Sequence, residues 1–376
     1  MPEPDPLPLS APVLLFHILL VGTFILHILA MNVLLGGSVL TAVNAVLDRI
    51  RPDARRALLL QRASRPLTLS AAMTVTLGVA PLLFLQLLFG PFFFTSSILM
   101  AWPWLSVVVF VMAAYAGLYL IEVRSRNLGS WAIAVRIGSA LIFAGVAFLY
   151  VNNVTLMLMP DEWREIYDDF RRGLYLPLGE ASLFPRYLHF LLGSLAMGGL
   201  ALLAYGLWIR HREAVFGDWC LRQGAQWFLG PTLLQAVIGP AFLLTQPSFA
   251  RDEFLAADLL ETGVLWAGVA AALIGFVLVL WTQRARAPTL PGVAAIASAV
   301  VSVALMAVAR DLLRTTLTSA DLDIYTLPSQ TEIVTVLLFF IVFAAGLGTV
   351  GYMLWLLATA RAATHPTAPP PPGTGN

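Results

Sequence analysis

The chain has few of the residues on which soluble and secreted proteins depend. It contains one cysteine, Cys220, and no lysine, and charged residues make up only 11% of its 376 positions. A single cysteine excludes a disulfide within the chain, an all-cysteine iron–sulfur site and the Cys-x-x-Cys-His attachment of a c-type haem. The formal net charge of +1 provides no basic surface for a phosphate backbone, so we expect no nucleic-acid partner.

Apolar residues make up most of the chain instead. Hydrophobic types account for 59% of the sequence and the mean hydropathy is +0.84, which is typical of an integral membrane protein. The first residues are acidic and rich in proline, without the basic stretch of a cleaved signal peptide. Nine apolar runs are long enough to cross a hydrocarbon core of about 30 Å. They lie near residues 12–46, 66–90, 98–121, 131–159, 183–209, 221–246, 262–282, 291–310 and 331–359.

Charged residues between these runs predict their orientation. Arginines gather in the loops after the first, third, fifth and seventh runs, and acidic residues gather in the alternate loops. Because basic loops stay in the cytoplasm, we expect the N-terminus outside, the C-terminus inside and a location in the bacterial cytoplasmic (inner) membrane. The arginines are Arg49, Arg51, Arg55, Arg56, Arg62, Arg65, Arg124, Arg126, Arg136, Arg210, Arg212, Arg222, Arg284 and Arg286.

The predicted fold is therefore an all-α integral membrane protein with nine transmembrane helices. We expect two four-helix bundles, one extra helix and short segments outside the membrane. The bundles cover residues 12–159 and 183–310, the ninth helix 331–360, the external segments 1–11, 160–182 and 311–330, and a disordered cytoplasmic tail 361–376. The 160–182 segment mixes aromatic and acidic residues, which favours a short surface helix that either covers the bundle or receives a basic cytochrome.

A short repeat supports the two-bundle prediction. Leu26-His27-Ile28-Leu29 precedes Gly36-Gly37, and Leu188-His189-Phe190-Leu191 precedes Gly198-Gly199 with the same spacing. The two copies lie on the first and fifth runs, which cross the membrane in the same direction. Nine residues separate each histidine from its first glycine, so the glycine pair faces away from the imidazole and allows another helix to approach closely.

Histidines inside apolar helices are the strongest functional signal. The first run contains His17 and His27, and the fifth contains His189. An imidazole in hydrocarbon is costly unless it faces a partner, a cavity or a metal. Ten residues separate His17 from His27, which places them about 80° and roughly 15 Å apart on a helix, too far to hold one ion together.

Haem suits these histidines better than the other cofactors considered. Zinc prefers four ligands from cysteine, histidine or carboxylate, and the runs contain no such cluster. A proton relay needs carboxylates in the helix interiors, where the sequence places none. A haem needs one or two axial imidazoles and an apolar cleft between helices, with arginines near the surface for its propionates.

Several motifs together resemble subunit I of the cytochrome bd-type terminal oxidases and their wider superfamily. That family also has nine helices with its N-terminus outside. The resemblance extends over most of the chain as an ordered set of short motifs. The matching stretches are His27-Ile-Leu-Ala-Met-Asn-Val-Leu-Leu-Gly36, Gly78 to Phe84-Leu-Gln86, Tyr115-Ala-Gly117-Leu-Tyr-Leu120, Asn153, Tyr187-Leu-His189-Phe190 and Gln246-Pro247.

The resemblance implies that His27 and His189 are axial haem ligands. From its depth, similar to that of His189, we infer His17 as a further ligand. Arg186, Arg310 and Arg314 are candidates for propionate contacts, with interfacial snorkelling as the alternative. Asn153 is a candidate to hydrogen-bond a ligand histidine, with helix packing as the alternative.

The sequence also departs from that family. Trp104 and Met112 stand where the family places glutamates for proton delivery, and Trp266 stands where it places a methionine ligand. The family's glutamate-containing motif in the eighth helix becomes Ala307-Val-Ala-Arg310-Asp-Leu-Leu-Arg314. A bis-imidazole iron is coordinatively filled, so these losses favour electron transfer over oxygen reduction.

We therefore predict a haem b-binding membrane subunit of a respiratory redox complex, with one to three haems b and haem d as a further option. Expected partners are a second membrane subunit, a periplasmic cytochrome c, or both, with quinol as a possible donor. Two alternatives remain open at this point. One is an active bd-like oxygen or nitric oxide reductase, and the other is a transporter or scaffold without haem.

Overall fold

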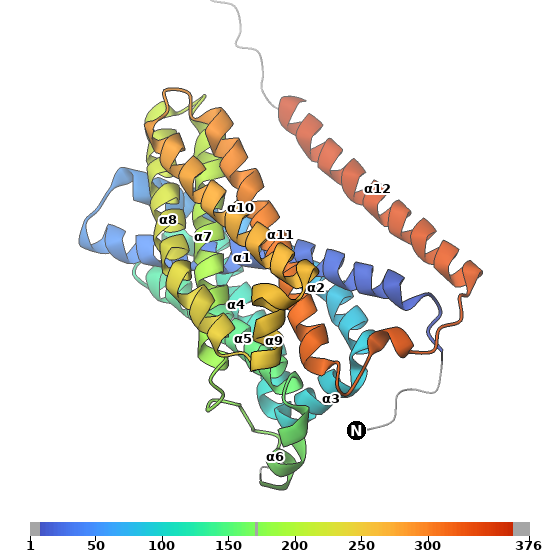
Figure 1. Ribbon diagram of the computed structural model, residues 1–376. Coiled ribbons are helices and arrows are strands. Elements are labelled where there is room, and N and C mark those ends of the chain that lie inside the picture. The colour runs from blue at the N-terminus through green and yellow to red at the C-terminus, as the bar shows by residue number, and fades with distance from the viewer. Residues whose placement is uncertain (1–7, 170–171, 364–376) are drawn as a thin grey trace, which may run out of the picture. The chain divides into compact units, whose positions relative to one another are not determined.

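The computed structural model describes residues 8–169 and 172–363, and every regular element longer than an isolated bridge in these ranges is a helix (Figure 1). The prediction of an all-α membrane protein is confirmed. The longer helices are α1 (Val13–Ile50), α2 (Ala54–Leu88), α3 (Gly90–Leu99), α4 (Ala101–Leu128), α5 (Trp131–Met157), α7 (Leu183–Ile209), α8 (Ala214–Leu244), α10 (Leu259–Arg284), α11 (Thr289–Thr318) and α12 (Ile333–Ala363).

Among the described residues, 8 helices are long and apolar enough to cross a membrane. They are α1, α2, α4, α5, α7, α8, α10 and α11, and they correspond to the first eight apolar runs. The ninth run corresponds to α12. The apolar stretch described in this helix, Ile333–Gly346, is shorter than the other eight. A ninth crossing and the orientation of the termini stay predictions.

Helix boundaries follow local capping more closely than hydropathy. Asp53 caps α2 by accepting a hydrogen bond from the Arg55 amide, so α2 begins at Ala54 and not at residue 66. Four arginines expected in the first loop, Arg55, Arg56, Arg62 and Arg65, therefore lie on this helix. Arginine, alanine and leucine are strong helix formers, and they extend the helix beyond its apolar part.

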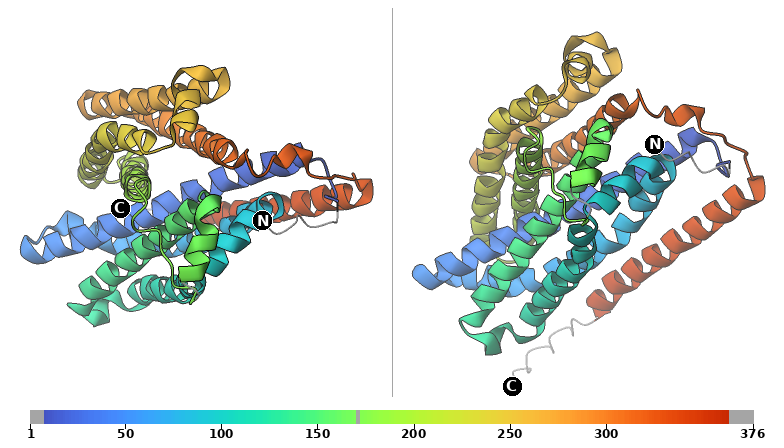
Figure 2. Two further views of the ribbon diagram at one scale, coloured as in Figure 1. Left: turned by 60° about the horizontal axis from the view of Figure 1, so that its bottom comes forward. Right: turned by 90° about the horizontal axis from the view of Figure 1, so that it is seen from below.

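Two apolar clusters organise the spans of the larger compact unit, residues 16–324. One joins α1, α2, α4 and α5 through Leu34, Leu67, Ala71, Leu118 and Phe143, among others. The other joins α7, α8, α10 and α11, which run side by side in both figures, and it includes Leu200, Leu203, Phe228, Val279 and Ala299 (Figures 1 and 2). The two clusters divide most of their residues between the same two sets of helices, and the organisation into two four-helix bundles stays a prediction.

Glycines of the two repeat copies meet between α1 and α7. A Cβ on Gly198 would lie 2.5 Å from the carbonyl carbon and 2.8 Å from the Cα of Gly36. The second glycine of each pair faces the following helix: a Cβ on Gly37 would lie 2.7 Å from Leu67 of α2, and one on Gly199 would lie 2.6 Å from the Phe228 amide of α8. The pairs therefore allow the close helix approach that their spacing predicts.

The end of α11 differs from the expected boundary. The helix continues to Thr318, whereas the sequence placed an external loop from residue 311. Asp311 and Arg314 are consequently buried helical residues, each 5% exposed. The expectation that helix interiors contain no carboxylate is therefore wrong, because Asp311 is stabilised inside the fold by partners that hydropathy does not detect.

A second compact unit contains residues 5–15 and 325–376. Within its described part, the Leu9 amide donates to the Pro328 carbonyl at 2.8 Å and the Gln330 amide donates to the Leu9 carbonyl at 2.7 Å, which makes an isolated parallel bridge between Leu9 and Ser329. Helix α12 follows this bridge.

Candidate functional site

His27 on α1 is held in one ring orientation by α2. Its Nδ1 lies 3.0 Å from the carbonyl oxygen of Thr74, and a nitrogen facing a carbonyl must carry the proton. The neutral ring then presents Nε2 as a lone pair. Gly78, one turn further along α2, makes room for the ring, since a Cβ there would lie 2.9 Å from both Cε1 and Nδ1.

His189 on α7 has an equivalent position beside α8. The Gln235 amide nitrogen donates to the His189 backbone carbonyl at 2.7 Å, and a Cβ on Gly239 would lie 3.9 Å from Cε1 and Nδ1 of the ring. Nδ1 of His189 and Oε1 of Gln235 are both buried without a hydrogen-bond partner among the described residues. In both repeat copies, therefore, a histidine packs against a glycine of the next long helix.

His17 is engaged differently. Its Nε2 pairs with the Asp311 carboxylate of α11, and the same carboxylate pairs with Arg314 one turn later. All three side chains are largely buried. The nitrogen that most often binds haem iron is thus occupied, which distinguishes His17 from His27.

The three arginines predicted to contact propionates lie in the interior of the fold. Arg186 is 5% exposed, donates to the Thr155 hydroxyl at 3.1 Å and lies 5.2 Å from the centre of the Phe242 ring. Arg310 lies 4.5 Å from the centre of Phe24, and Arg314 lies 4.3 Å from that of Phe89. Arg310 is close enough to Arg186 and Arg314 for their positive charges to repel one another.

Positive charge exceeds negative charge at this site. Asp311 is the one buried carboxylate among the described residues there, and it pairs with Arg314. Nε of Arg314 remains buried without a hydrogen-bond partner in the described part of the chain. Because burying an unbalanced charge is costly, an arrangement with two further guanidinium groups favours an anionic ligand.

Two phenylalanines connect the arginines to the histidines. Phe24 lies under Arg310, and its ring centre is 6.3 Å from that of His27. Phe242 lies under Arg186, and its ring stacks with His189 at 6.2 Å. Arg310 also acts electrostatically on His27. Arg310 therefore lies near His27, and it is also close enough to Arg186, the neighbour of His189 through Phe242, to repel its charge.

The space inside this site is small. A cavity between α1 and α11 is lined by Leu20, Val21, Phe24, Ala307, Arg310, Asp311 and Arg314 and has a volume of about 10 Å³. That volume holds about one water molecule. The described residues contain no group of three or more histidine, cysteine, aspartate or glutamate side chains placed to hold a metal ion, whereas a haem iron needs at most two such ligands.

Other candidate residues have partners elsewhere. Asn153 donates to the Ser97 hydroxyl at 3.2 Å and so connects α5 to α3, not to a histidine. Trp104 packs edge-on against Tyr150 at 4.9 Å between ring centres. Trp266, in the position inferred for a methionine ligand, is exposed on α10.

The 160–182 segment contains the short helix α6 (Trp163–Asp169). Trp163 anchors this helix, because its indole donates to the Leu156 carbonyl at 2.8 Å and packs against Phe92. Partial burial raises the pKa of the Glu162 carboxyl, and repulsion from Glu180, Glu165 and Asp161 raises it further. Residues 160–182 contain six carboxylates and three arginines, so the segment is acidic overall. Its role as a cytochrome-binding face stays a prediction.

Sequence reasoning missed the residues that orient the site. Asp311, Gln235 and the Thr74 carbonyl have no motif of their own. One signal was present: Asp311 and Arg314 are spaced to share a helix face, which predicts an ion pair if α11 continues. Nothing in the sequence indicated which histidine the carboxylate would contact.

The comparisons with known proteins agree with the geometry of the fold. No family model and no curated protein matches the sequence. A solved structure described as the bd oxidase from Geobacillus thermodenitrificans matches with a TM-score of 0.70, 13% sequence identity, and coverage of 95% of this chain and 100% of that chain. At this identity the match shows a shared fold: the chain is a multi-pass membrane protein with a bd oxidase-like arrangement of helices.

Proposed function

We propose that this chain is a haem b-binding membrane subunit of a respiratory redox complex, with His27 as an axial ligand. The observation that carries the proposal is the hydrogen bond from His27 Nδ1 to the Thr74 carbonyl, which leaves Nε2 free to bind iron. His189 is the second proposed ligand. Its equivalent position beside Gly239 supports this role.

The buried arginines fit the acidic part of a haem. Two propionates would balance the excess charge of Arg186 and Arg310, and the unpartnered Nε of Arg314 would gain an acceptor. A bound haem b would supply an iron that changes between the ferric and ferrous states. The chain itself would orient the two imidazoles, exclude water and place positive charge near the edge of the haem that carries the propionates.

Haem binding requires the side chains between α1 and α11 to separate. A pocket for a ligand of drug size is roughly 300–1,000 Å³, far larger than the cavity beside Arg310. Phe24 and Arg310 contact each other and line this cavity, so they are the side chains that must move. His17 has a different proposed role, which is to hold Asp311 through Nε2; that it also binds iron stays a prediction.

The first experiment is a reduced-minus-oxidised spectrum of the purified full chain. We expect a b-type haem band that is weakened in His27→Ala and in His189→Ala and unchanged in His211→Ala, a control at an exposed histidine between α7 and α8. A normal band in both site variants would overturn the assignment of ligands. An unchanged low-spin signal in His17→Ala would show that His17 is not a ligand.

Carbon monoxide separates electron transfer from the alternative of an oxygen or nitric oxide reductase. An iron whose two axial positions were both filled by imidazoles would not bind carbon monoxide, so little spectral shift in the reduced protein would favour electron transfer. A clear shift would indicate an open iron position and favour the reductase.

A second candidate function is a haem-free scaffold subunit of the same fold. The small cavity beside Arg310 and the occupied nitrogen of His17 favour it. In that case the histidines and arginines stabilise helix contacts only. Absence of any haem band from a folded, full-length preparation would select this candidate over the first.

The partners follow from the same proposal. A second membrane subunit and a donor, either quinol or a periplasmic cytochrome c at the acidic 160–182 segment, would complete an electron path near the outer face. The complete architecture then has nine crossings, with α12 as the last one, in the bacterial inner membrane.

A further inference from the structure

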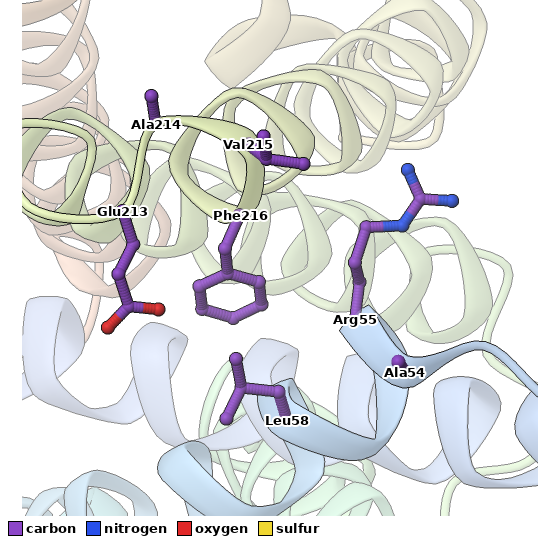
Figure 3. Close-up of a pocket in the computed structure, with 7 residues that line it drawn as sticks. All are labelled: Ala54, Arg55, Leu58, Glu213, Ala214, Val215 and Phe216. Carbon is purple, nitrogen blue, oxygen red and sulfur yellow. The ribbon is translucent and has the colours of Figure 1, made fainter.

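A second recess lies between the first turns of α2 and α8, and none of the histidines or arginines of the candidate site lines it (Figure 3). It has a volume of about 320 Å³, and its walls are mostly apolar. Figure 3 shows Phe216 and Leu58 facing each other across it, with Arg55 on one side and Glu213 on the other. Ala54, Ala214 and Val215 complete the lining. We call these seven residues the basal groove.

The groove lies at the arginine-rich end of the spans. In residues 48–65 and 210–222, nine arginines stand against four carboxylates. Three of these arginines have carboxylate partners: Arg55 with Asp53, Arg62 with Glu213 and Arg210 with Asp218. The surroundings of the groove therefore carry a substantial excess of positive charge, which complements an anionic ligand.

The interior of the groove suits a hydrocarbon chain. Arg62 bonds Glu213 at 2.8 Å, so this carboxylate is paired with a positive charge, and the same guanidinium lies 5.2 Å from the centre of the Phe216 ring. Val215 is 76% exposed at the mouth, where an apolar side chain gains from contact with lipid. The side chain of Arg55 is 45% exposed and pairs with Asp53 through Nε and Nη2, so a phosphate would meet this guanidinium at Nη1 or in competition with the Asp53 carboxylate.

We propose that the basal groove binds one anionic phospholipid, with its phosphate beside Arg55 and the upper part of an acyl chain against Leu58, Val215 and Phe216. Two features favour a lipid over a soluble anion. The groove opens at the first turns of two candidate spans, and most of the side chains that line it are apolar. Its basic surroundings suit either kind of anion. Basic recesses between transmembrane helices are typical binding places for anionic headgroups.

The test measures lipid retention by the full-length protein in nanodiscs that contain equal amounts of phosphatidylglycerol and phosphatidylcholine. After extraction into mild detergent, we expect native mass spectrometry to find phosphatidylglycerol retained preferentially. Arg55→Gln should reduce this preference about fivefold, since a basic side chain near a charged headgroup contributes on that scale. Arg286→Gln, which removes an exposed arginine from the same side of the membrane, should leave it unchanged.

A second pair of variants tests the apolar part. Ala54→Trp fills the groove from an exposed position and should abolish retention, whereas Ala57→Trp on the same helix, outside the lining, should not. Both sites are exposed, and an unchanged thermal midpoint would show that each variant folds. Three outcomes would each overturn the proposal. They are equal retention of the two lipids, equal effects of a variant and its control, and full competition by soluble glycerol phosphate.

Discussion

At the residue scale, the function proposed for this chain depends on which neighbouring group engages each histidine ring. His27 and His17 lie on the same helix and have similar surroundings in the sequence. In the structure one faces a carbonyl and the other a carboxylate. A carbonyl engages Nδ1 and leaves Nε2 available, whereas the carboxylate occupies Nε2. The two residues therefore separate into a proposed ligand and a proposed holder of Asp311.

Substitution of Gly78 tests the orientation of His27. In Gly78→Ala the new Cβ would lie 2.9 Å from the imidazole, closer than side-chain atoms pack, so the ring must turn and lose its bond to Thr74. We expect the haem band to weaken or change spin state while α1 and α2 stay folded. Absorption and circular dichroism spectra measure the two effects.

The matched control for that variant is Gly22→Ala, on the His27 helix itself. A Cβ at Gly22 meets nothing within 4 Å, so its spectrum should equal that of the unmodified protein. If Gly78→Ala leaves the haem band unchanged, the proposed orientation of His27 is wrong.

At the element scale, α1 and α7 are the two helices that carry the histidines, and glycines determine how closely they approach. Ser194 on α7 also donates to the Asn32 side chain of α1 at 2.8 Å. Gly36 and Gly198 meet across this contact, whereas their neighbours Gly37 and Gly199 pack against α2 and α8. The distance between the two histidines is therefore set by residues about ten positions away from them.

Gly198→Ala tests this contact. The added Cβ would lie 2.5 Å from the Gly36 backbone, and two backbones in contact cannot yield as a flexible side chain does. We expect a loss of stability of about 1–3 kcal/mol and a lower thermal midpoint in detergent. Gly145→Ala is the control, because a Cβ there meets nothing within 4 Å. Equal midpoints for the two variants would contradict the close approach.

At the scale of the whole molecule, the chain combines a bd oxidase-like fold with a charge distribution that predicts its orientation. The arginine-rich ends of α2 and α8 lie at one end of the spans, and α6 belongs to an acidic segment between spans. Because Cys220 is the one cysteine and is fully buried, introduced cysteines report sidedness without interference.

We expect Asp169→Cys to react with a membrane-impermeant maleimide in intact spheroplasts, since the acidic segment is predicted outside. Arg286→Cys should react only after the membrane is permeabilised. The parent protein, with buried Cys220, should remain unlabelled under both conditions. Labelling of Arg286→Cys in intact spheroplasts would reverse the predicted orientation.

Hydropathy by itself determined that this is an all-helical, multi-pass membrane protein and located its spans, because burial in hydrocarbon is a property of each segment alone. The repeat predicted the glycine contacts for the same reason, since helical spacing is local. Tertiary structure decided the rest. It extended α11 past Asp311, paired that carboxylate with His17 and Arg314, and placed the Thr74 carbonyl against His27. Except for the Asp311–Arg314 pair, which lies within one helix, these contacts join residues that are far apart in the chain, so their energies depend on partners that no single segment specifies.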